Sequence, residues 1–205
     1  MHVPPEGLAA IAGGGFVAIF GAAVWASTAS YNRRVRANFA QLAEKFSLRV
    51  DLARRHGISA RPTADGTYRG RRTQVISTVQ PPRRRWPMTL ILVEHRGEPI
   101  DFTIGRPLLG WRDPKKVYVA TGDAAFDREF LVCGPHDRLV GALTPALRAK
   151  LLRAVELGIS LAAVRAAGRE LSLDIHLLLD SDLQRRLAEH MIDVLHDLAD
   201  RLEKT

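Results

Sequence analysis

A long run of residues without charge lies near the start of the chain. No Asp, Glu, Lys or Arg occurs among the 26 positions from Gly7 to Asn32, where the stretch LAAIAGGGFVAIFGAAVWASTASY is mostly apolar. A helix of roughly 20 such residues is long enough to cross the hydrocarbon core of a bilayer. The glycines of AGGGF lack the spacing of a phosphate-binding loop. The pattern therefore predicts that residues 1–31 form an N-terminal segment with a transmembrane helix.

The charges around this segment predict its orientation. The preceding residues MHVPPEG contain no Lys or Arg, whereas Arg33, Arg34 and Arg36 follow it closely. A secretory signal carries its positive charge before the apolar run, and Lys and Arg favour the cytoplasmic side of a membrane helix. We therefore expect an uncleaved, single-pass protein of the bacterial inner (cytoplasmic) membrane, with the C-terminal domain in the cytoplasm. The alternative is a secreted protein whose signal peptide is cleaved near Ala29.

Small residues recur every four positions along the same segment. Such a stripe lets two helix backbones approach closely in lipid, so it indicates a homo-oligomer formed through this helix. An Ala- and Gly-rich segment also produces such a stripe by chance. The stripe consists of Ala10, Gly14, Ala18, Ala22, Ala26 and Ser30.

The residues after this segment continue with helical spacing. Apolar positions recur three or four residues apart, which is typical of one face of a helix, until Gly57 and Pro62 interrupt the pattern. Residues 32–64 are therefore predicted as a juxtamembrane helix and linker. We expect the apolar face to pack on the domain that follows, and the alternative is that it lies on a lipid surface. The apolar positions are Val35, Phe39, Leu42 and Phe46.

Residues 65–205 are predicted as one α+β domain. The segments GTYRGRRTQVISTV, WPMTLILVEHRG, IDFTI and ISLAAVRAAGRELSLDI indicate strands, and their links are too short for parallel crossovers. Two of these segments are expected to turn at Gly70 and Gly168. Residues 126–133 are also predicted as a strand, after a turn at Gly122 and Asp123.

Two helices are predicted in the same domain. Thr144 followed by Pro145 is typical of a helix start. A leucine stripe that begins after Ser181 indicates a long C-terminal helix. The expected fold class is therefore α+β, with an N-terminal transmembrane helix followed by a mainly antiparallel sheet and a long C-terminal helix.

The charge of the chain is positive and unevenly distributed. The net charge is +8 at pH 7, and residues 31–120 hold 19 Lys and Arg against 7 Asp and Glu. A basic region directly after an apolar run favours an anionic membrane surface. Nucleic-acid binding is not expected, because few aromatic residues accompany the basic runs. The predicted lipid-facing groups are Arg33, Arg34, Arg36, Arg83, Arg84 and Arg85.

Several His and Asp residues lie at helical spacing near the C-terminus. Residues three or four positions apart on a helix are placed to share a metal ion. These residues lie opposite the leucine stripe, however, so a solvated helix face explains them. No metal site and no cofactor is therefore predicted. The residues are His190, Asp193, His196, Asp197 and Asp200.

A second polar group follows residue 120. Asp123 and Asp127 are close enough in sequence to act as paired carboxylates, and Cys133 and His136 follow them. Turn capping and solvation at a strand end also explain these residues, and the chain has no nucleophile elbow, phosphate loop or metalloprotease motif. No catalytic residue is therefore assigned. Cys133 is the single cysteine, which excludes an intramolecular disulfide.

Two adjacent motifs resemble a pattern in uncharacterised bacterial membrane-anchored proteins. TGDAAFDREFLV at residues 121–132 matches TGDxxFDxxFxV, and the LTP of residues 143–145 matches the helix start that follows it in those proteins. The resemblance covers the region after residue 65. It implies a membrane helix followed by an α+β domain with two strands and a long last helix, and it implies no activity.

These patterns together favour a binding protein. The apolar segment and the charge asymmetry predict a membrane-anchored protein whose cytoplasmic α+β domain is an interaction module. Its expected partner is an unknown protein, a second copy of the chain or anionic lipid headgroups. The alternative function is an enzyme with an unrecognised site near Asp123, Asp127 and His136.

Overall fold

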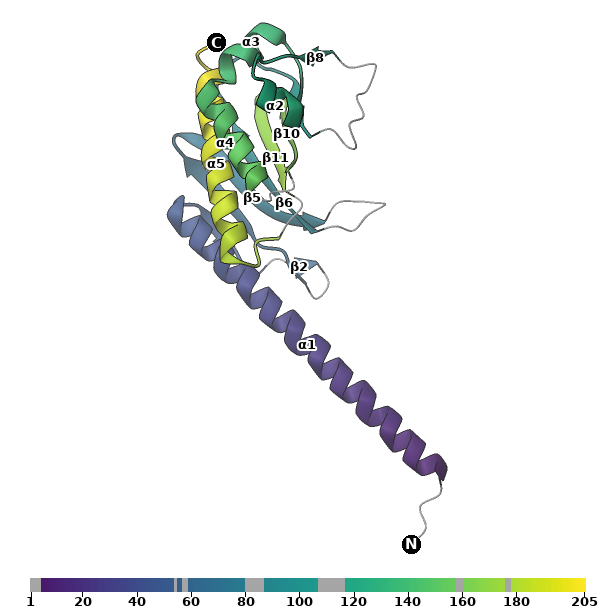
Figure 1. Cartoon of the computed structure of the whole chain (residues 1–205). Helices are drawn as coiled ribbons and strands as arrows, with labels where there is room; N and C mark the ends of the chain where they lie inside the picture. The colour runs from purple at the N-terminus through teal and green to yellow at the C-terminus, as the bar shows by residue number, and fades with distance from the viewer. Residues whose placement is uncertain are drawn as a thin grey trace.

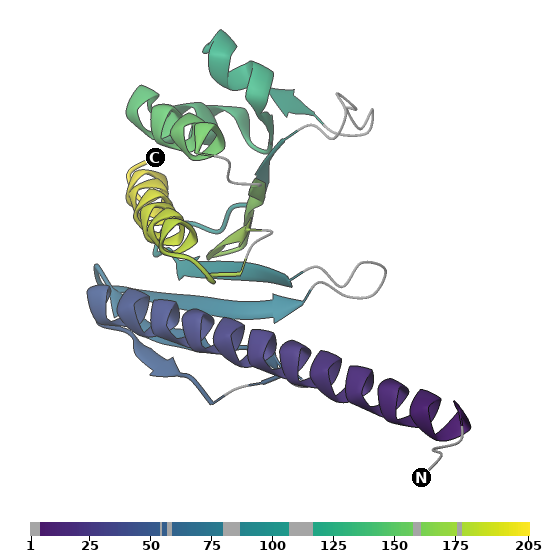
Figure 2. The same cartoon turned by 60° about the horizontal axis from the view of Figure 1, so that its bottom comes forward.

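One curved sheet with helices on its inner face forms the body of the protein (Figures 1 and 2). The structure is a computed structural model that describes residues 5–53, 55–56, 59–79, 87–106, 117–157, 161–175 and 178–205. Side chains are included except for those of residues 5–21, 55–56, 79, 87 and 161–162. Over these ranges the chain forms five helices and eleven strands.

Nine of these strands form the sheet, in the order β1-β4-β5-β6-β11-β10-β7-β9-β8. Every neighbouring pair is antiparallel, so the predicted antiparallel sheet is confirmed. The other two, β2 (Arg55–His56) and β3 (Ser59–Ala60), pair with each other. The nine strands are β1 (Arg49–Asp51), β4 (Thr63–Tyr68), β5 (Arg71–Val79), β6 (Pro87–Glu94), β7 (Phe102–Gly105), β8 (Tyr118–Val119), β9 (Leu131–Cys133), β10 (Leu161–Ala167) and β11 (Glu170–Ile175).

Two tight turns join neighbouring strands where glycine permits a left-handed backbone. Gly70 has a φ of 75° between β4 and β5, and Gly168 has a φ of 64° between β10 and β11. A residue with a Cβ atom adopts this conformation at a cost, so glycine favours a tight turn at both positions. The two turns expected at these glycines are confirmed.

Four helices follow the first strands along the chain: α2 (Ala124–Glu129), α3 (His136–Ala142), α4 (Pro145–Glu156) and α5 (Asp182–Leu202). Thr144 caps α4 and Pro145 occupies its first turn, as predicted. Ser181 and Gln184 form a capping box at the start of α5, which confirms the long C-terminal helix. The sheet curves around α5, and α4 lies beside α5 on the same side (Figure 2).

Helix α1 (Pro5–Lys45) has two parts with different surroundings. Its C-terminal part packs on α5 and on the strands β1, β3 and β4. Val35, Phe39, Leu42 and Phe46 are at most 2% exposed, so the predicted apolar face packs on the domain. The part before residue 30 extends away from the body (Figure 1). This division makes α1 both a core element and a projecting arm.

The transmembrane helix predicted within residues 1–31 is wrong. Where the structure describes side chains, no helix combines the length and the apolar character that a membrane span requires. In that part of α1, Arg33, Arg34 and Arg36 interrupt the apolar sequence, and the large apolar side chains after them face protein. The same finding contradicts three further predictions. These are the membrane helix in the fold class, the single-pass membrane assignment, and the inner-membrane localisation with a cytoplasmic C-terminal domain.

The strand predicted over residues 126–133 is also wrong in its first half. Residues 124–129 form α2, and only Leu131–Cys133 form a strand. The side chain of Asp123 accepts hydrogen bonds from the backbone N–H groups of Ala125 and Phe126, which caps the helix. Phe126 and Phe130 are four residues apart and stack with ring centroids 4.8 Å apart, so helical spacing buries both rings.

The buried face of α1 generates a stability prediction. Phe39 is fully buried in the core, so replacing it with Ala leaves a cavity. We expect Phe39→Ala to lower the free energy of unfolding by about 3–5 kcal/mol in urea denaturation. Gln41→Ala changes an exposed residue of the same helix and serves as the control, with an expected effect within about 0.5 kcal/mol. Equal effects of the two variants would contradict the packing of α1 on the body.

Candidate functional site

The base of α1, where the helix leaves the body, combines charge, burial and exposed apolar surface. We define it by Tyr31, Asn32, Arg34, Arg36 and Arg61. The backbone N–H of Ala60 donates to Asn32 Oδ1 at 2.7 Å, which ties the end of β3 to the helix. One turn and a half later, Asn38 Nδ2 donates to the carbonyl of Leu179 at 3.0 Å. These two contacts fix the helix at the point where it enters the body.

Arg61 is the unusual member of the α1 base. It follows β3 directly and is only 9% exposed, and its Nε and Nη1 atoms are buried without a hydrogen-bond partner. Burial raises the pKa of the Tyr31 phenol, and the charge of Arg61 and a hydrogen bond from it oppose that rise. Asp180 also acts on Tyr31 through its charge. A buried guanidinium with two unused donors is the kind of group that an anionic partner would satisfy.

Three predicted basic residues lie along the same turns of α1. Arg33 and Arg34 are exposed, and Arg34 Nη1 donates to Ser30 Oγ at 3.3 Å. Arg36 is partly buried, with its Nε atom buried and without a hydrogen-bond partner. The structure therefore brings Arg33, Arg34 and Arg36 to the base of α1. The other predicted basic group, Arg83 to Arg85, lies outside the described residues.

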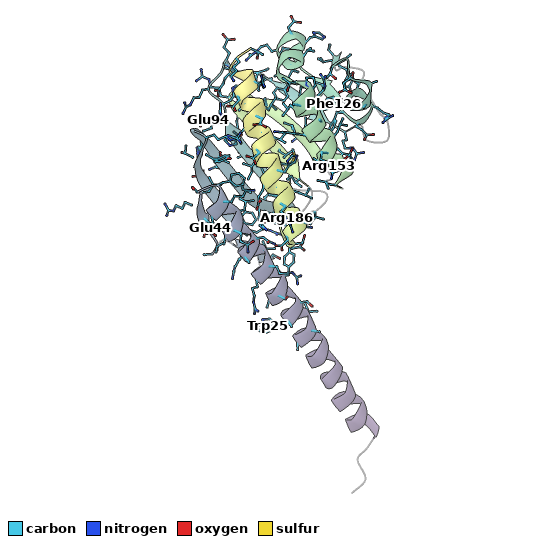
Figure 3. The ribbon with its side chains drawn as sticks, turned by 60° about the vertical axis from the view of Figure 1, so that its left-hand side comes forward. Trp25, Glu44, Glu94, Phe126, Arg153 and Arg186 are labelled. Carbon is cyan, nitrogen blue, oxygen red and sulfur yellow. The ribbon has the colours of Figure 1, made fainter. Side chains whose placement is uncertain are left out.

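The projecting arm of α1 is exposed over residues 22–27. Val24 is 46% exposed and Trp25 is 74% exposed, and Figure 3 shows Trp25 on the part of the helix beyond the body. Ala22, Ala26 and Ser30 of the predicted small-residue stripe are exposed on the same part of the helix. The side chains of the remaining stripe residues, Ala10, Gly14 and Ala18, lie outside the described set.

A cluster of ion pairs lies where the β4–β5 hairpin crosses α5. Arg69 contacts Asp193 and Asp197 at 3.3 and 2.9 Å, and Lys150 of α4 contacts Asp197 at 2.6 Å. Arg71, which is buried, contacts Asp200 at 2.6 Å and Glu203 at 2.7 Å. The acidic groups predicted as a solvated helix face are thus paired with cations from two other elements. Such pairing holds the hairpin against the helix.

His196 lies beneath these ion pairs and corrects the prediction of a solvated face. It is fully buried, its Nε2 atom is 3.0 Å from Thr73 Oγ1, and its ring meets Tyr68 edge-on with centroids 4.8 Å apart. Helical spacing placed His196 opposite the leucine stripe and so predicted exposure, but the β4–β5 hairpin covers a second side of α5. Burial, followed by the charges of Arg71 and Arg69, lowers the pKa of His196 to about 4.

The residues of the alternative enzymatic site have local structural contacts. Asp123 caps α2, and its Oδ2 atom is 3.2 Å from Arg148 Nε. The backbone N–H of Phe126 is the largest of the causes that lower the pKa of Asp123. Asp127 accepts hydrogen bonds from the backbone and hydroxyl of Thr121, and His136 is an exposed residue whose Nδ1 is 3.0 Å from Asp137.

The described residues hold no group of three His, Cys, Asp or Glu side chains arranged to bind a metal ion. Cys133 is partly buried at the end of β9. The ion pairs of α5 hold secondary structure elements together. At the α1 base, by contrast, Arg36 and Arg61 have buried nitrogen atoms without hydrogen-bond partners, and an apolar arm is adjacent. The α1 base is therefore the better candidate for binding another molecule.

No protein-family model and no curated protein matches the chain. Among solved structures, the chain is similar to the crystal structure of the mycobacterial trehalose monomycolate transport factor A, TtfA, with a TM-score of 0.53. The match covers 84% of this chain and 94% of that chain at 12% sequence identity. At this identity the similarity concerns the fold alone. The resemblance to proteins with the TGDxxFDxxFxV motif stays a prediction.

The buried His196 generates a pH prediction. The folded protein keeps His196 neutral down to about pH 4, whereas the unfolded chain binds a proton at this residue near pH 6.5. Because the unfolded state then holds more protons, the free energy of unfolding should fall as pH falls from 6.5 to about 4. Urea denaturation across this range measures the slope, and His196→Gln should reduce it. An unchanged slope in His196→Gln would contradict a buried neutral imidazole.

Proposed function

We propose that this chain is an interaction module that binds a protein partner through the arm of α1. The observation that carries the proposal is the contrast within this helix. Phe39 and Leu42 are fully buried in the core, whereas Trp25 is 74% exposed. Trp is enriched among the residues that contribute most to protein interfaces. A helix fixed in the body and exposed at its other end presents such a residue with little loss of conformational freedom on binding.

The charges beside the arm support a specific kind of partner. Arg33 and Arg34 are exposed between Trp25 and the body. A partner that matches this surface has an apolar patch for Val24 and Trp25 and acidic side chains that face the arginines. The apolar patch would supply affinity, and the opposite charges would favour the correct orientation.

The similarity to TtfA supports an interaction role more than a catalytic one. TtfA is named as a transport factor for trehalose monomycolate. By this analogy of fold, we propose that the present chain acts as an accessory component of a transport system by contacting other proteins of that system. The structural contacts of Asp123 and Asp127 give the enzymatic alternative less support, because both carboxylates already accept hydrogen bonds from residues nearby in the sequence.

A second copy of the chain is the other candidate partner. Ala22 and Ala26 are exposed beside Trp25, and small residues let two helices pack closely. The exposed Arg33 and Arg34 argue against this arrangement in a parallel pair, because the arginines of both copies would then lie near each other. A partner with acidic side chains avoids that repulsion.

The proposal is tested by site-specific photo-crosslinking in cells that produce the full chain. Benzoylphenylalanine placed at residue 25 should form an adduct with one other protein, identified by mass spectrometry of the crosslinked peptide. We expect that peptide to be apolar and flanked by Asp or Glu. The matched control places the crosslinker at Leu183, another exposed large apolar residue, which is 58% exposed on α5.

Charge reversal of Arg33 and Arg34 to Glu should lower the yield of the adduct by about tenfold, because it replaces attraction by repulsion. If the adducts contain only a second copy of the chain, the arm binds another copy, and the proposed partner with acidic side chains is wrong. Equal yields at residue 25 and at Leu183, or a yield that charge reversal leaves unchanged, would contradict the proposal.

A further inference from the structure

Arg61 differs from the other buried arginines in the described part of the chain. Arg71 is similarly buried, yet it contacts the carboxylates of Asp200 and Glu203. Arg138 and Arg185 each have a buried Nε without a partner, but their terminal nitrogens bind backbone carbonyls and Glu189 respectively. Arg61 has both Nε and Nη1 buried without a partner. Since arginine stays charged in proteins, this position carries a buried cation with unused donors.

The backbone holds Arg61 firmly on both sides. The preceding residue, Ala60, donates its N–H to Asn32 at 2.7 Å, and the following residue, Pro62, accepts a hydrogen bond from the N–H of Ser77 at 3.1 Å. These contacts fix the backbone at Arg61 against α1 and β5, and Arg61 is only 9% exposed. A cation held in place by the fold is preorganised for an anionic ligand.

Basic groups of α1 lie near Tyr31, the residue that contacts Arg61. Tyr31 is close enough for a hydrogen bond with Arg61, and the charge of Arg34 also acts on the Tyr31 phenol. Arg36 lies one helical turn beyond Asn32, with its own Nε buried and without a partner. The charge of Asp180 acts on Tyr31 in the opposite sense. An excess of positive charge with unused N–H donors requires a ligand that is both anionic and rich in acceptor oxygens.

We propose that the α1 base is a binding site for a phosphate group, held by Arg61 with Tyr31, Arg34 and Arg36. A phosphate group has negative charge and several acceptor oxygens, and arginine binds it through strong charge-assisted hydrogen bonds. Arg34 is the exposed member of the site. Its source is either a free phosphate compound or the headgroup of an anionic phospholipid. The site does not depend on the protein partner proposed for the α1 arm.

The test uses the purified full chain and two probes. The first probe is inorganic phosphate at constant ionic strength, with the midpoint of thermal unfolding as the measurement. Binding to the folded state raises this midpoint with phosphate concentration. The second probe is a set of phosphatidylcholine vesicles with and without phosphatidylglycerol, with co-sedimentation of the chain as the measurement. Both arms use the purified chain alone, so neither result depends on the crosslinking of a protein partner.

Arg61→Gln should lower the apparent affinity for the effective probe by about tenfold or more, because one charge-assisted contact is lost. Arg153→Gln is the matched control, since Arg153 is an exposed arginine paired with Glu156, and it should change nothing. If Arg61→Gln does not fold, then Arg61→Lys and Arg36→Gln replace it, each with a smaller expected loss.

The outcomes separate the two sources. An Arg61-dependent rise of the midpoint in inorganic phosphate supports a free phosphate ligand. Arg61-dependent sedimentation with phosphatidylglycerol vesicles alone supports a lipid headgroup. Absence of both effects, or effects that persist undiminished in the Arg61 variants, overturns the proposal. Phosphate also stabilises proteins by exclusion from their surface. This general effect raises the unfolding midpoint of every variant equally, so only the difference between the variants reports binding at Arg61.

Discussion

The burial of α5 within the curved sheet is the constraint on which the rest of the structure depends. A helix normally buries one stripe of residues and exposes the other face. Helix α5 is buried on more than one side, because it contacts β6 and β11 as well as α1, α3 and α4. Its buried residues include not only the leucine stripe but also Glu189 and His196. Every element that packs on α5 must therefore supply either apolar surface or a polar partner.

The polar partners of α5 come from segments far away in the sequence. Lys45 at the end of α1 contacts the buried Glu189 at 2.7 Å, and Arg71 of β5 contacts Glu203 at 2.7 Å. The hydrogen bond from Arg71 is the main cause that lowers the pKa of Glu203 to about 2. Removing one partner of such a pair would leave a buried charge, which is strongly destabilising. Charge pairing thus determines which segments lie against α5 and in what register.

The same packing gives α1 its two roles. The helix must enter the body because Val35 and Phe39 belong to the core around α5. Asn32 and Asn38 then hold it to β3 and to the loop before α5. Beyond this point the body offers no further surface, so the arm of α1 extends outward with Trp25 exposed (Figure 3). The exposed arm and the buried Arg61 therefore lie close together, where the core of the protein ends.

The turns and helix starts could be predicted from the sequence alone, because they depend on only a few neighbouring residues. The turns at Gly70 and Gly168, the capped start of α4 and the start of α5 at Ser181 follow from backbone conformation and capping within a few residues. The sequence also indicated the apolar face of α1 that packs on the body.

Only the tertiary structure showed which polar residues of α5 are buried and that Arg61 has two buried nitrogen atoms without hydrogen-bond partners. His196 looks solvated from its helix position, but it is buried because the β4–β5 hairpin, more than 100 residues earlier, covers it. Arg61 has no sequence signal that separates it from the other basic residues. Its burial accompanies the packing of β3, the strand directly before it, on α1. Such properties depend on contacts between segments that are distant in sequence, and the spacing of residues along the chain does not predict these contacts.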